Sequence, residues 1–181
     1  MSHYKVKAAV NLLDSDVKAI LNFWEMTNGQ NMTPDVFKEK FKNSEFHLLK
    51  DHSSNLRAVA RMNFDFKLKI DDQTYTYPEF GGFVAKPRSK GYGTELLVNL
   101  IQNLKKRKIE ALGFCEKPLR LYYEKCGIQI LYDQAKFLRE AGENDWVISS
   151  DDDILDLTLS PASVQLLQSL NSANLAYLID D

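Results

Sequence analysis

Residues 83–94 have the sequence FVAKPRSKGYGT, which joins a predicted strand to a predicted helix. Gly91 and Gly93 lack side chains, so a bulky anion can approach the backbone closely at both positions. The first N–H groups of a helix have no intrahelical partner, and with the helix dipole they favour phosphate groups. Three cationic side chains stand next to these amides: Lys86, Arg88 and Lys90. The stretch therefore predicts a pyrophosphate cradle, although Gly-x-Gly at a helix start is also common as a plain tight turn.

The segments on either side of this stretch predict an α+β fold. Cap residues and apolar spacing indicate two N-terminal helices, at residues 14–29 and 33–41. Alternating apolar residues then indicate three strands, at 46–49, 56–70 and 74–85. After the cradle we expect helices at 94–108, 118–125 and 160–171, and strands at 109–114, 128–132, 146–149 and 154–159. This order predicts a mixed, mostly antiparallel sheet flanked by helices.

Composition is typical of a globular protein. The chain has 181 residues, of which 44% are hydrophobic and 27% are charged, enough to bury a sizeable core. We expect a single domain over residues 1–181, with a core at about 46–132 and a C-terminal extension at 133–181. The formal net charge of −2 gives no overall attraction to nucleic acid or to anionic lipid.

Neither targeting nor metal-binding signals stand out in the sequence. No segment has the long apolar centre of a signal peptide or a membrane helix. Cys115 and Cys126 lack the spacing of zinc ligands, and we expect both to be free thiols. The run Asp151-Asp152-Asp153 is interpreted as a solvated turn rather than a metal site. These observations favour a cytoplasmic protein that binds no metal, nucleic acid or membrane.

Two motifs together resemble those of the GNAT acyltransferases. Residues 88–93 match the family signature [QR]-x-x-G-x-[GA], and residues 123–128, YEKCGI, are similar to its later Y-E-K-x-G-[FIW] element. One predicted helix and one predicted strand separate the two motifs, as in the family. The resemblance covers roughly residues 56–132. Two departures concern the loop: Ser89 stands where the family usually has glycine, and Pro87 lies later than the usual proline.

The resemblance implies a GNAT-type fold with acetyl-CoA as co-substrate. It implies direct transfer of an acetyl group to a primary amine of a small molecule, without a covalent enzyme intermediate. The backbone that would hold the pantetheine arm belongs to Gly82, Phe83 and Val84. The residues that would hold the pyrophosphate are Arg88, Ser89, Lys90, Gly91, Tyr92, Gly93 and Thr94. The family tyrosine that protonates the departing thiolate corresponds to Tyr123.

Each candidate catalytic residue also has a purely structural interpretation. Tyr123 is either the general acid or an aromatic residue that packs its helix on the sheet, and Tyr122 is the expected core member of the pair. Cys126 is interpreted as a small core residue. Glu79 is the leading candidate for the general base, because it shares strand parity with Phe83. Its alternatives are a solvated edge carboxylate and a water chain in its place.

The sequence leaves the acceptor open. We expect its pocket near the first two helices and strand 56–66, where Trp24, Glu25 and Asp65 are available, although Trp24 suits the core equally. The C-terminal part loosely resembles the tail of aminoglycoside acetyltransferases. Alternatives are a protein-amine acetyltransferase, a non-catalytic acyl-CoA sensor and an interaction domain. The segments after residue 160 either pack on the sheet or form a contact in a homodimer.

Overall fold

The computed structural model describes residues 2–26, 32–143 and 145–179. They fall into two compact units. The N-terminal unit comprises residues 1–64 and 80–102, and the C-terminal unit comprises residues 65–79 and 103–181. Within the described ranges, no helix has both the length and the apolar character needed to cross a membrane. The expected single domain over residues 1–181 stays a prediction.

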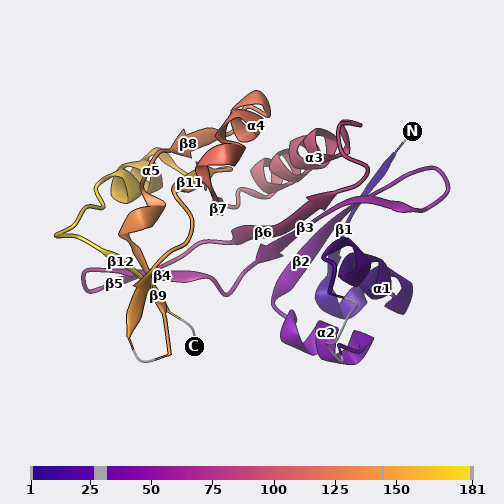
Figure 1. Cartoon of the computed structure of the whole chain (residues 1–181), viewed down its shortest axis with the longest axis horizontal. Coiled ribbons are helices and arrows are strands. Elements are labelled where there is room, and N and C mark those ends of the chain that lie inside the picture. The colour runs from indigo at the N-terminus through magenta and orange to yellow at the C-terminus, as the bar shows by residue number, and fades with distance from the viewer. Residues whose placement is uncertain (1, 27–31, 144, 180–181) are drawn as a thin grey trace. The chain divides into compact units, whose positions relative to one another are not determined.

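The N-terminal unit contains four strands of one sheet, with helices on both faces. Its strands occur in the order β1-β2-β3-β6, and the pairs β1–β2 and β2–β3 are antiparallel. Their bounds are β1 His3–Ala8, β2 Ser44–Lys50, β3 Leu56–Asn63 and β6 Glu79–Ala85. Helices α1 (Asp14–Phe23) and α2 (Pro34–Lys40) cover one face, and α3 (Tyr92–Arg107) begins on the other (Figure 1). A 3-10 turn, η1, spans Ala9–Asn11.

Aromatic packing fills the core between the first two helices and the sheet. The Phe37 ring lies 5.3 Å from the Phe46 ring and 5.9 Å from the Trp24 ring, measured between centroids. Phe37 and Phe46 are fully buried. The Thr33 hydroxyl accepts from the Val36 amide and caps α2, as the sequence predicted. This core fixes the end of α1, and therefore Trp24, against β6.

A buried carboxylate joins α1 to two strands of the same unit. Asp16 has no exposed side-chain surface, and its oxygens lie 2.6 Å from both Lys7 Nζ and Lys50 Nζ. It also accepts from the Leu13 amide at 3.2 Å. Burial by itself raises the pKa of Asp16, but the two ammonium groups and the amide lower it from 3.8 to about 2. The carboxylate therefore stabilises the fold only where it is ionised.

The Asp16→Asn variant is expected to lose about 2–3 kcal/mol of unfolding free energy at pH 7. Because the folded pKa lies below the unfolded one, this contribution is present above about pH 4 and disappears as the pH falls toward 2. Urea unfolding of both proteins between pH 7 and pH 2.5 measures it. The control is Asp14→Asn, which removes an exposed pair with Lys38 and is expected to cost under about 1 kcal/mol. Equal losses in both variants, or a loss independent of pH, would contradict the prediction.

The C-terminal unit contains strands of two sheets. In the first, β11 pairs antiparallel with both β7 and β8. The second has the order β10-β9-β12-β4-β5, in which only β9 and β12 are parallel. Strand bounds are β4 Lys67–Ile70, β5 Gln73–Thr76, β7 Leu112–Cys115, β8 Gln129–Leu131, β9 Leu138–Ala141, β10 Trp146–Ile148, β11 Asp153–Asp156 and β12 Ala176–Ile179. The helices are η2 Lys117–Leu119, α4 Arg120–Lys125, η3 Ala135–Phe137 and α5 Pro161–Gln168.

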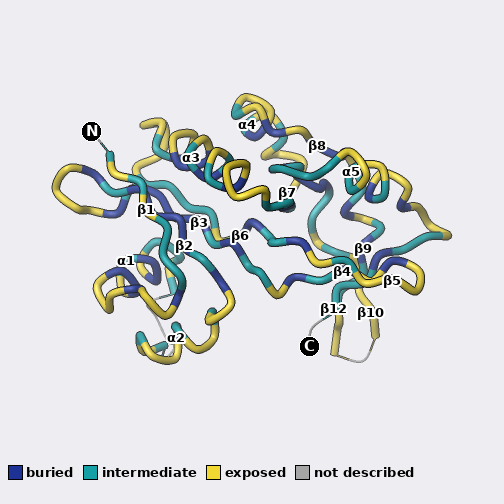
Figure 2. The backbone as a smooth tube through the Cα atoms, turned by 180° about the vertical axis from the view of Figure 1, so that it is seen from behind, coloured by how far each residue is buried: buried dark blue, intermediate teal, exposed yellow. Residues whose placement is uncertain are grey.

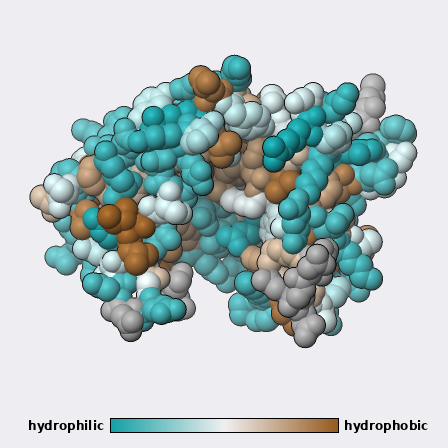
Figure 3. Space-filling view, viewed as in Figure 1, coloured by the Kyte–Doolittle hydropathy of each residue, from teal (hydrophilic) through white to brown (hydrophobic). Residues whose placement is uncertain are grey.

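The surface of the protein is mixed. Strand β10, at the edge of its sheet, is exposed along its whole length (Figure 2). Figure 3 shows mainly hydrophilic side chains on the face of Figure 1, with separate small hydrophobic groups.

The α+β fold class and the mostly antiparallel sheets predicted from the sequence are confirmed.

Two predicted strands are in fact four. The predicted strand at 56–70 divides into β3 and β4, which belong to different units, and the one at 74–85 divides into β5 and β6. Pro78 lies at the second break, and it lacks an amide hydrogen and restricts the residue before it. Three strands were not predicted: β1, β9 and β12. Helix α1 ends at Phe23, and the expected stop at Asn28-Gly29 lies outside the described residues.

Candidate functional site

The glycine loop of the N-terminal unit connects β6 to α3. Gly91 has a φ of +79° and its carbonyl accepts the first helical hydrogen bond, from the Glu95 amide at 2.9 Å. The helix therefore begins immediately after Gly91, and the amides of Tyr92, Gly93 and Thr94 belong to its first turn. Such amides have no intrahelical partner and carry the positive end of the helix dipole. The predicted motif residues thus form the N-terminus of a 16-residue helix.

The side of this loop around Gly91 is open. Among the described residues, a Cβ atom placed on Gly91 meets no atom within 4 Å other than those of its chain neighbours. Arg88, Ser89 and Lys90 are exposed next to it, and Ser89 has a φ of +61°. A non-glycine residue with a positive φ is uncommon, so Ser89 adopts the backbone conformation for which the family's usual glycine is suited. The loop can therefore bend at Ser89 despite that departure from the family motif.

An arginine that was not singled out in the sequence holds the start of α3. The Arg57 guanidinium lies 5.9 Å from the centroid of the Tyr92 ring and 2.5 Å from Asp51 Oδ2. Asp51 also accepts from the Ser53 and Asn55 amides, at 2.9 and 3.0 Å. Burial raises the pKa of Asp51, but Arg57 and these amides bring it down to about 2. Together, Asp51 and Arg57 fix Tyr92 beside β3, which orients the first turn of the helix.

One of the three predicted cations is engaged elsewhere. Lys86 Nζ lies 2.9 Å from Glu25 Oε1 and 5.7 Å from the centroid of the Phe23 ring. Its hydrogen bond and charge lower the pKa of Glu25. Lys86 therefore ties the loop to the end of α1, whereas Arg88 and Lys90 extend from the exposed part of the loop. Glu25, expected in the acceptor pocket, is the partner of Lys86.

The backbone predicted to hold a pantetheine arm is partly used by the protein. The Trp24 indole donates to the Gly82 carbonyl at 2.7 Å. Gly82 has a φ of +56°, and a Cβ there would lie 2.6 Å from Trp24 Cζ2. Trp24 is thus a half-buried residue that packs on Gly82 and against the core, and the Gly82 position requires glycine. Phe83 and Val84 follow it along β6, both half-buried.

The second motif forms α4 of the C-terminal unit, and it corrects two predictions. Tyr123, and not Tyr122, is the buried member of the pair, with 5% of its surface exposed. Cys126 is half-buried rather than a core residue. Burial, with smaller contributions from Cys115 and Tyr122, raises the pKa of Tyr123 above its ordinary value of 10. The Tyr123 phenol therefore stays protonated throughout the neutral range, as a general acid requires.

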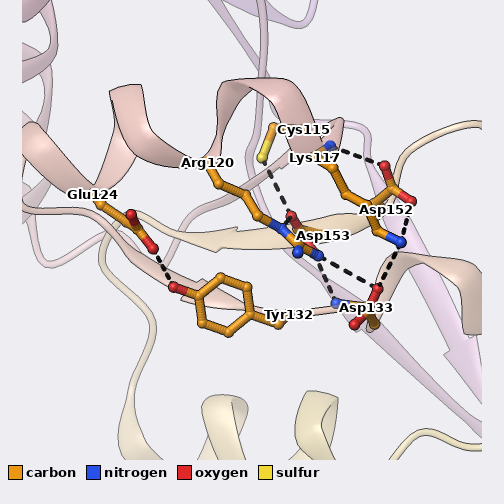
Figure 4. Close-up of polar contacts among 8 residues, drawn as sticks. All are labelled: Cys115, Lys117, Arg120, Glu124, Tyr132, Asp133, Asp152 and Asp153. Atoms are coloured by element: carbon orange, nitrogen blue, oxygen red, sulfur yellow. Dashed lines mark hydrogen bonds and ion pairs between the residues drawn. The ribbon is translucent and has the colours of Figure 1, made fainter.

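A buried ion pair anchors the first residue of α4 (Figure 4). Arg120 Nε lies 2.5 Å from Asp153 Oδ2, and Arg120 Nη2 lies 2.6 Å from Asp153 Oδ1. Asp153 is fully buried on β11 and also accepts from the Asp133 amide at 2.7 Å. The expectation of a solvated turn at 151–153 is therefore wrong, because Asp153 is a core residue paired with Arg120. This pair fixes α4, and with it Tyr123, to the β7-β11-β8 sheet.

Cys115 and Tyr132 border this ion pair (Figure 4). The Cys115 sulfur lies 3.9 Å from Asp153 Oδ2, and burial together with that carboxylate raises the pKa of the thiol to about 12. Tyr132 donates a hydrogen bond to Glu124 at the other end of α4. A thiol so far from ionisation is a poor nucleophile, so the geometry gives Cys115 a structural role.

Glu79 lies in a pocket and not on a solvated edge. It is half-buried at the start of β6, within the C-terminal unit. The pocket has a volume of about 220 Å³, and its lining includes Glu79, Glu140, Asp151, Ser149, Phe66 and Phe114. Asp65, also expected near the acceptor, is exposed in the same unit. Glu79, one of the acidic groups predicted for acceptor chemistry, therefore lines a defined cavity.

No protein-family model and no curated protein matches the sequence. Solved structures do match the fold. A GNAT family N-acetyltransferase from Escherichia coli, YhbS, in complex with CoA, is 11% identical with a TM-score of 0.60, over 98% of this chain and 89% of that one. An N-acetyltransferase from Staphylococcus aureus is 15% identical, with a TM-score of 0.56 over 87% and 98% of the two chains. A probable N-acyltransferase from Enterococcus faecalis is 11% identical, with a TM-score of 0.55. This match covers 73% of this chain but only 33% of that one, so the chain spans about a third of that protein's length.

The chain therefore has the fold of the GNAT acyltransferases, as the two sequence motifs implied. At these identities the likeness concerns the fold, and the chemistry has to be argued from the residues themselves.

Proposed function

We propose that this protein is a cytoplasmic, single-domain N-acetyltransferase that moves an acetyl group from acetyl-CoA to a primary amine of a small molecule. The observation that carries the proposal is the loop at the N-terminus of α3, where Gly91 turns the backbone at φ +79° and leaves open space beside the first helical amides. A helix N-terminus of this kind suits a pyrophosphate. CoA contains a pyrophosphate, and YhbS, which shares the fold, is in complex with CoA.

In this proposal the motif residues hold the cofactor. The pyrophosphate is bound by the segment from Arg88 to Thr94, mainly through its backbone amides, with Arg88 and Lys90 adding positive charge. The pantetheine arm follows the backbone of Phe83 and Val84. Gly82 contributes less than the sequence predicted, because its carbonyl accepts from the Trp24 indole.

In the proposed reaction the acetyl group passes directly from the thioester to the amine, while protons leave the nitrogen and reach the sulfur. The acceptor ammonium first loses a proton, to Glu79 or through water, and becomes a neutral amine. The amine nitrogen then attacks the thioester carbonyl carbon, and the carbon–sulfur bond breaks. The Tyr123 hydroxyl supplies a proton to the departing thiolate. The nitrogen, which is cationic after the attack, releases its second proton through water to the Tyr123 oxygen, so the product is a neutral amide and the hydroxyl is restored. A positioned acid and base of this kind contribute about 10²- to 10⁴-fold each.

A thermal-shift titration with acetyl-CoA tests the proposal. A ligand that binds only the native state stabilises it by about 2.7 kcal/mol at a hundred times its dissociation constant. We expect the melting temperature to rise with acetyl-CoA and to rise less with pantetheine, which lacks the pyrophosphate. Thiol release in the presence of amines then separates an enzyme from an acyl-CoA sensor. No shift at millimolar acetyl-CoA would refute both.

A further inference from the structure

Strand β10 of the C-terminal unit is an apolar strand at the open edge of its sheet. It is the last strand in the order β10-β9-β12-β4-β5 and, within the described residues, it pairs only with β9. Its residues Trp146, Val147 and Ile148 have 44%, 49% and 62% of their surface exposed. Figure 2 shows this exposure along the whole strand. A hydrophobic edge of this kind is open to pairing with another strand.

Other edge strands of the protein carry polar or charged side chains. Strand β5, at the opposite edge of the same sheet, has the sequence QTYT. Strand β1, an edge strand in the N-terminal unit, carries Lys5 and Lys7. Charged side chains and prolines keep natural edge strands from pairing. Strand β10 contains neither, so it lacks this protection.

The hydrogen bonds between β9 and β10 show which residues of the edge strand face its neighbour. The Gly142 amide donates to the Asp145 carbonyl at 2.8 Å, and the Ser149 amide donates to the Leu138 carbonyl at 3.3 Å. In an antiparallel ladder every second residue bonds to the neighbouring strand. The backbone groups of Asp145, Val147 and Ser149 therefore face β9.

The two remaining residues of β10 present their backbone to the open edge. By the same alternation, the N–H and C=O groups of Trp146 and Ile148 point away from β9. In agreement with this, the Trp146 amide donates to the side chain of the preceding residue, Asp145, at 2.7 Å. Each of the two residues has one donor and one acceptor, so an added strand forms four hydrogen bonds at this edge.

Two copies of β10 fit each other when they pair antiparallel about a two-fold axis at Val147. This register places Trp146 of one copy opposite Ile148 of the other, so both outward-facing residues of each strand meet outward-facing residues. The Trp146 amide then exchanges the Asp145 carboxylate for the Ile148 carbonyl of the second copy. A shift by one residue would place outward groups opposite groups that are already bonded to β9. The backbone therefore favours the register centred on Val147.

The same register matches the side chains. Trp146 and Ile148 lie on one face of the strand and Val147 lies on the other. Trp146 of each copy is then beside Ile148 of the other, and the two Val147 side chains lie against each other. Aromatic and β-branched residues are favourable cross-strand neighbours. The next pair outward is Asp145 opposite Ser149, which brings no like charges together.

We propose that residues 146–148 pair with the same residues of a second copy of this chain and form a symmetric homodimer. Its sheet is continuous across the two-fold axis. Two strands of three residues form an interface smaller than the roughly 1,200–2,000 Å² buried in stable complexes. The dimer is therefore weak, with a dissociation constant between about 10 μM and 1 mM. It does not depend on the proposed N-acetyltransferase function, because β10 contributes no residue to the proposed cradle.

Sedimentation equilibrium of the unmodified chain, without acetyl-CoA, tests the dimer. Between about 10 μM and 1 mM we expect the average mass to rise from 20.8 kDa toward twice that value. Val147→Lys sets two like charges opposite each other at the axis, and Ile148→Lys adds a charge that opposes edge pairing. Each is expected to weaken association by about tenfold or more. Leu121→Lys is the matched control, because Leu121 is 68% exposed on α4, outside this sheet.

A mixture of Val147→Lys and Val147→Glu tests the register. Each variant repels its own copies at the axis, whereas a mixed pair sets opposite charges against each other. We expect the mixture to associate about tenfold or more tightly than either variant alone. Hydrogen exchange of the unmodified chain gives a readout that needs no variant. The Ile148 amide is expected to exchange more slowly as the protein concentration rises, because pairing gives it an acceptor.

The results of these measurements decide whether β10 pairs with itself. Association that is weakened in Val147→Lys and Ile148→Lys, kept in Leu121→Lys and restored in the mixture supports the homodimer. A constant mass of 20.8 kDa up to about 1 mM overturns it and leaves the edge to a segment of another protein. Equal association in all three lysine variants, or a mixture no tighter than its components, overturns it as well. If a variant fails to fold, an Ile148 exchange rate independent of concentration still overturns it.

Discussion

Replacing Gly91 with valine is expected to reduce acetyl-CoA affinity at least a hundredfold while the protein still folds. Gly91 has a φ of +79°, so a β-branched residue there is strained by about 1–3 kcal/mol. In the part of the chain that the structure describes, no atom beyond the chain neighbours lies within 4 Å of a Cβ atom placed at this position, so the substitution causes no clash there. The side chain would instead occupy the space from which a pyrophosphate approaches the amides of the first helical turn. Titration calorimetry with acetyl-CoA measures the loss, and the melting temperature reports folding.

Gly127→Val is the matched control for this substitution. Gly127 follows α4 and has a φ of +77°, and no described residue beyond its chain neighbours has an atom within 4 Å of a Cβ position there. The backbone strain and the space are thus nearly the same, but Gly127 lies in the C-terminal unit and outside the cradle. We expect a similar loss of stability in both variants and a loss of acetyl-CoA affinity only in Gly91→Val. Equal affinities would place the pyrophosphate elsewhere.

The sequence predicted the local parts of the site because each depends on a few neighbouring residues. A glycine pair followed by an amphipathic stretch predicts a helix N-terminus from neighbouring residues alone, and α3 does begin directly after Gly91. The helix cap at Thr33 likewise depends only on residues close to it in the sequence. The motif at 123–128 likewise gave α4 and the turn at Gly127. None of these predictions required knowledge of the tertiary structure.

The sequence did not show which side chains are engaged at long range. The Trp24 indole reaches the Gly82 carbonyl across 58 positions, and Arg120 pairs with Asp153 across 33. The residues next to each partner in the sequence contain no pattern from which either contact could be predicted. An aspartate run is ordinarily solvated, and only the placement of β11 between β7 and β8 makes Asp153 a core residue. The Asp51–Arg57 pair had a weak local signal, because both residues flank one short turn.

The alternation of apolar residues predicted which residues form strands, but it did not predict where one strand ends and the next begins. Period-two patterning continues from β3 into β4, although the chain leaves one sheet and enters another between Asn63 and Lys67. Alternation records which side chains are buried and not which strand they pair with. Besides the neighbouring β5, β4 pairs with β12, more than a hundred positions away, with Ala176 opposite Ile70. The pocket around Glu79 depends on this pairing, since β12 contributes Leu178 to its wall.

The Tyr123→Phe variant is expected to lower kcat about 10²- to 10⁴-fold and to leave acetyl-CoA affinity unchanged. The substitution removes one hydroxyl from a side chain with 5% of its surface exposed, so packing of the ring is retained. Because burial raises the pKa of Tyr123 above 10, the hydroxyl is a proton donor at every pH from 6 to 10. Ionisation of this group therefore produces no alkaline fall in wild-type kcat within that range. Steady-state thiol release across this pH range measures both effects.

Tyr122→Phe distinguishes chemistry from packing in the same helix. Tyr122 is the neighbouring residue, its ring lies 5.3 Å from that of Tyr123 between centroids, and it is half-buried. Loss of its hydroxyl changes a neighbouring side chain of α4 but removes no proposed proton donor. We expect kcat to change less than about threefold in Tyr122→Phe, because surface and half-buried substitutions away from the chemistry usually cost little. If both variants lose activity equally, or neither does, Tyr123 is a packing residue and the thiolate takes its proton from water.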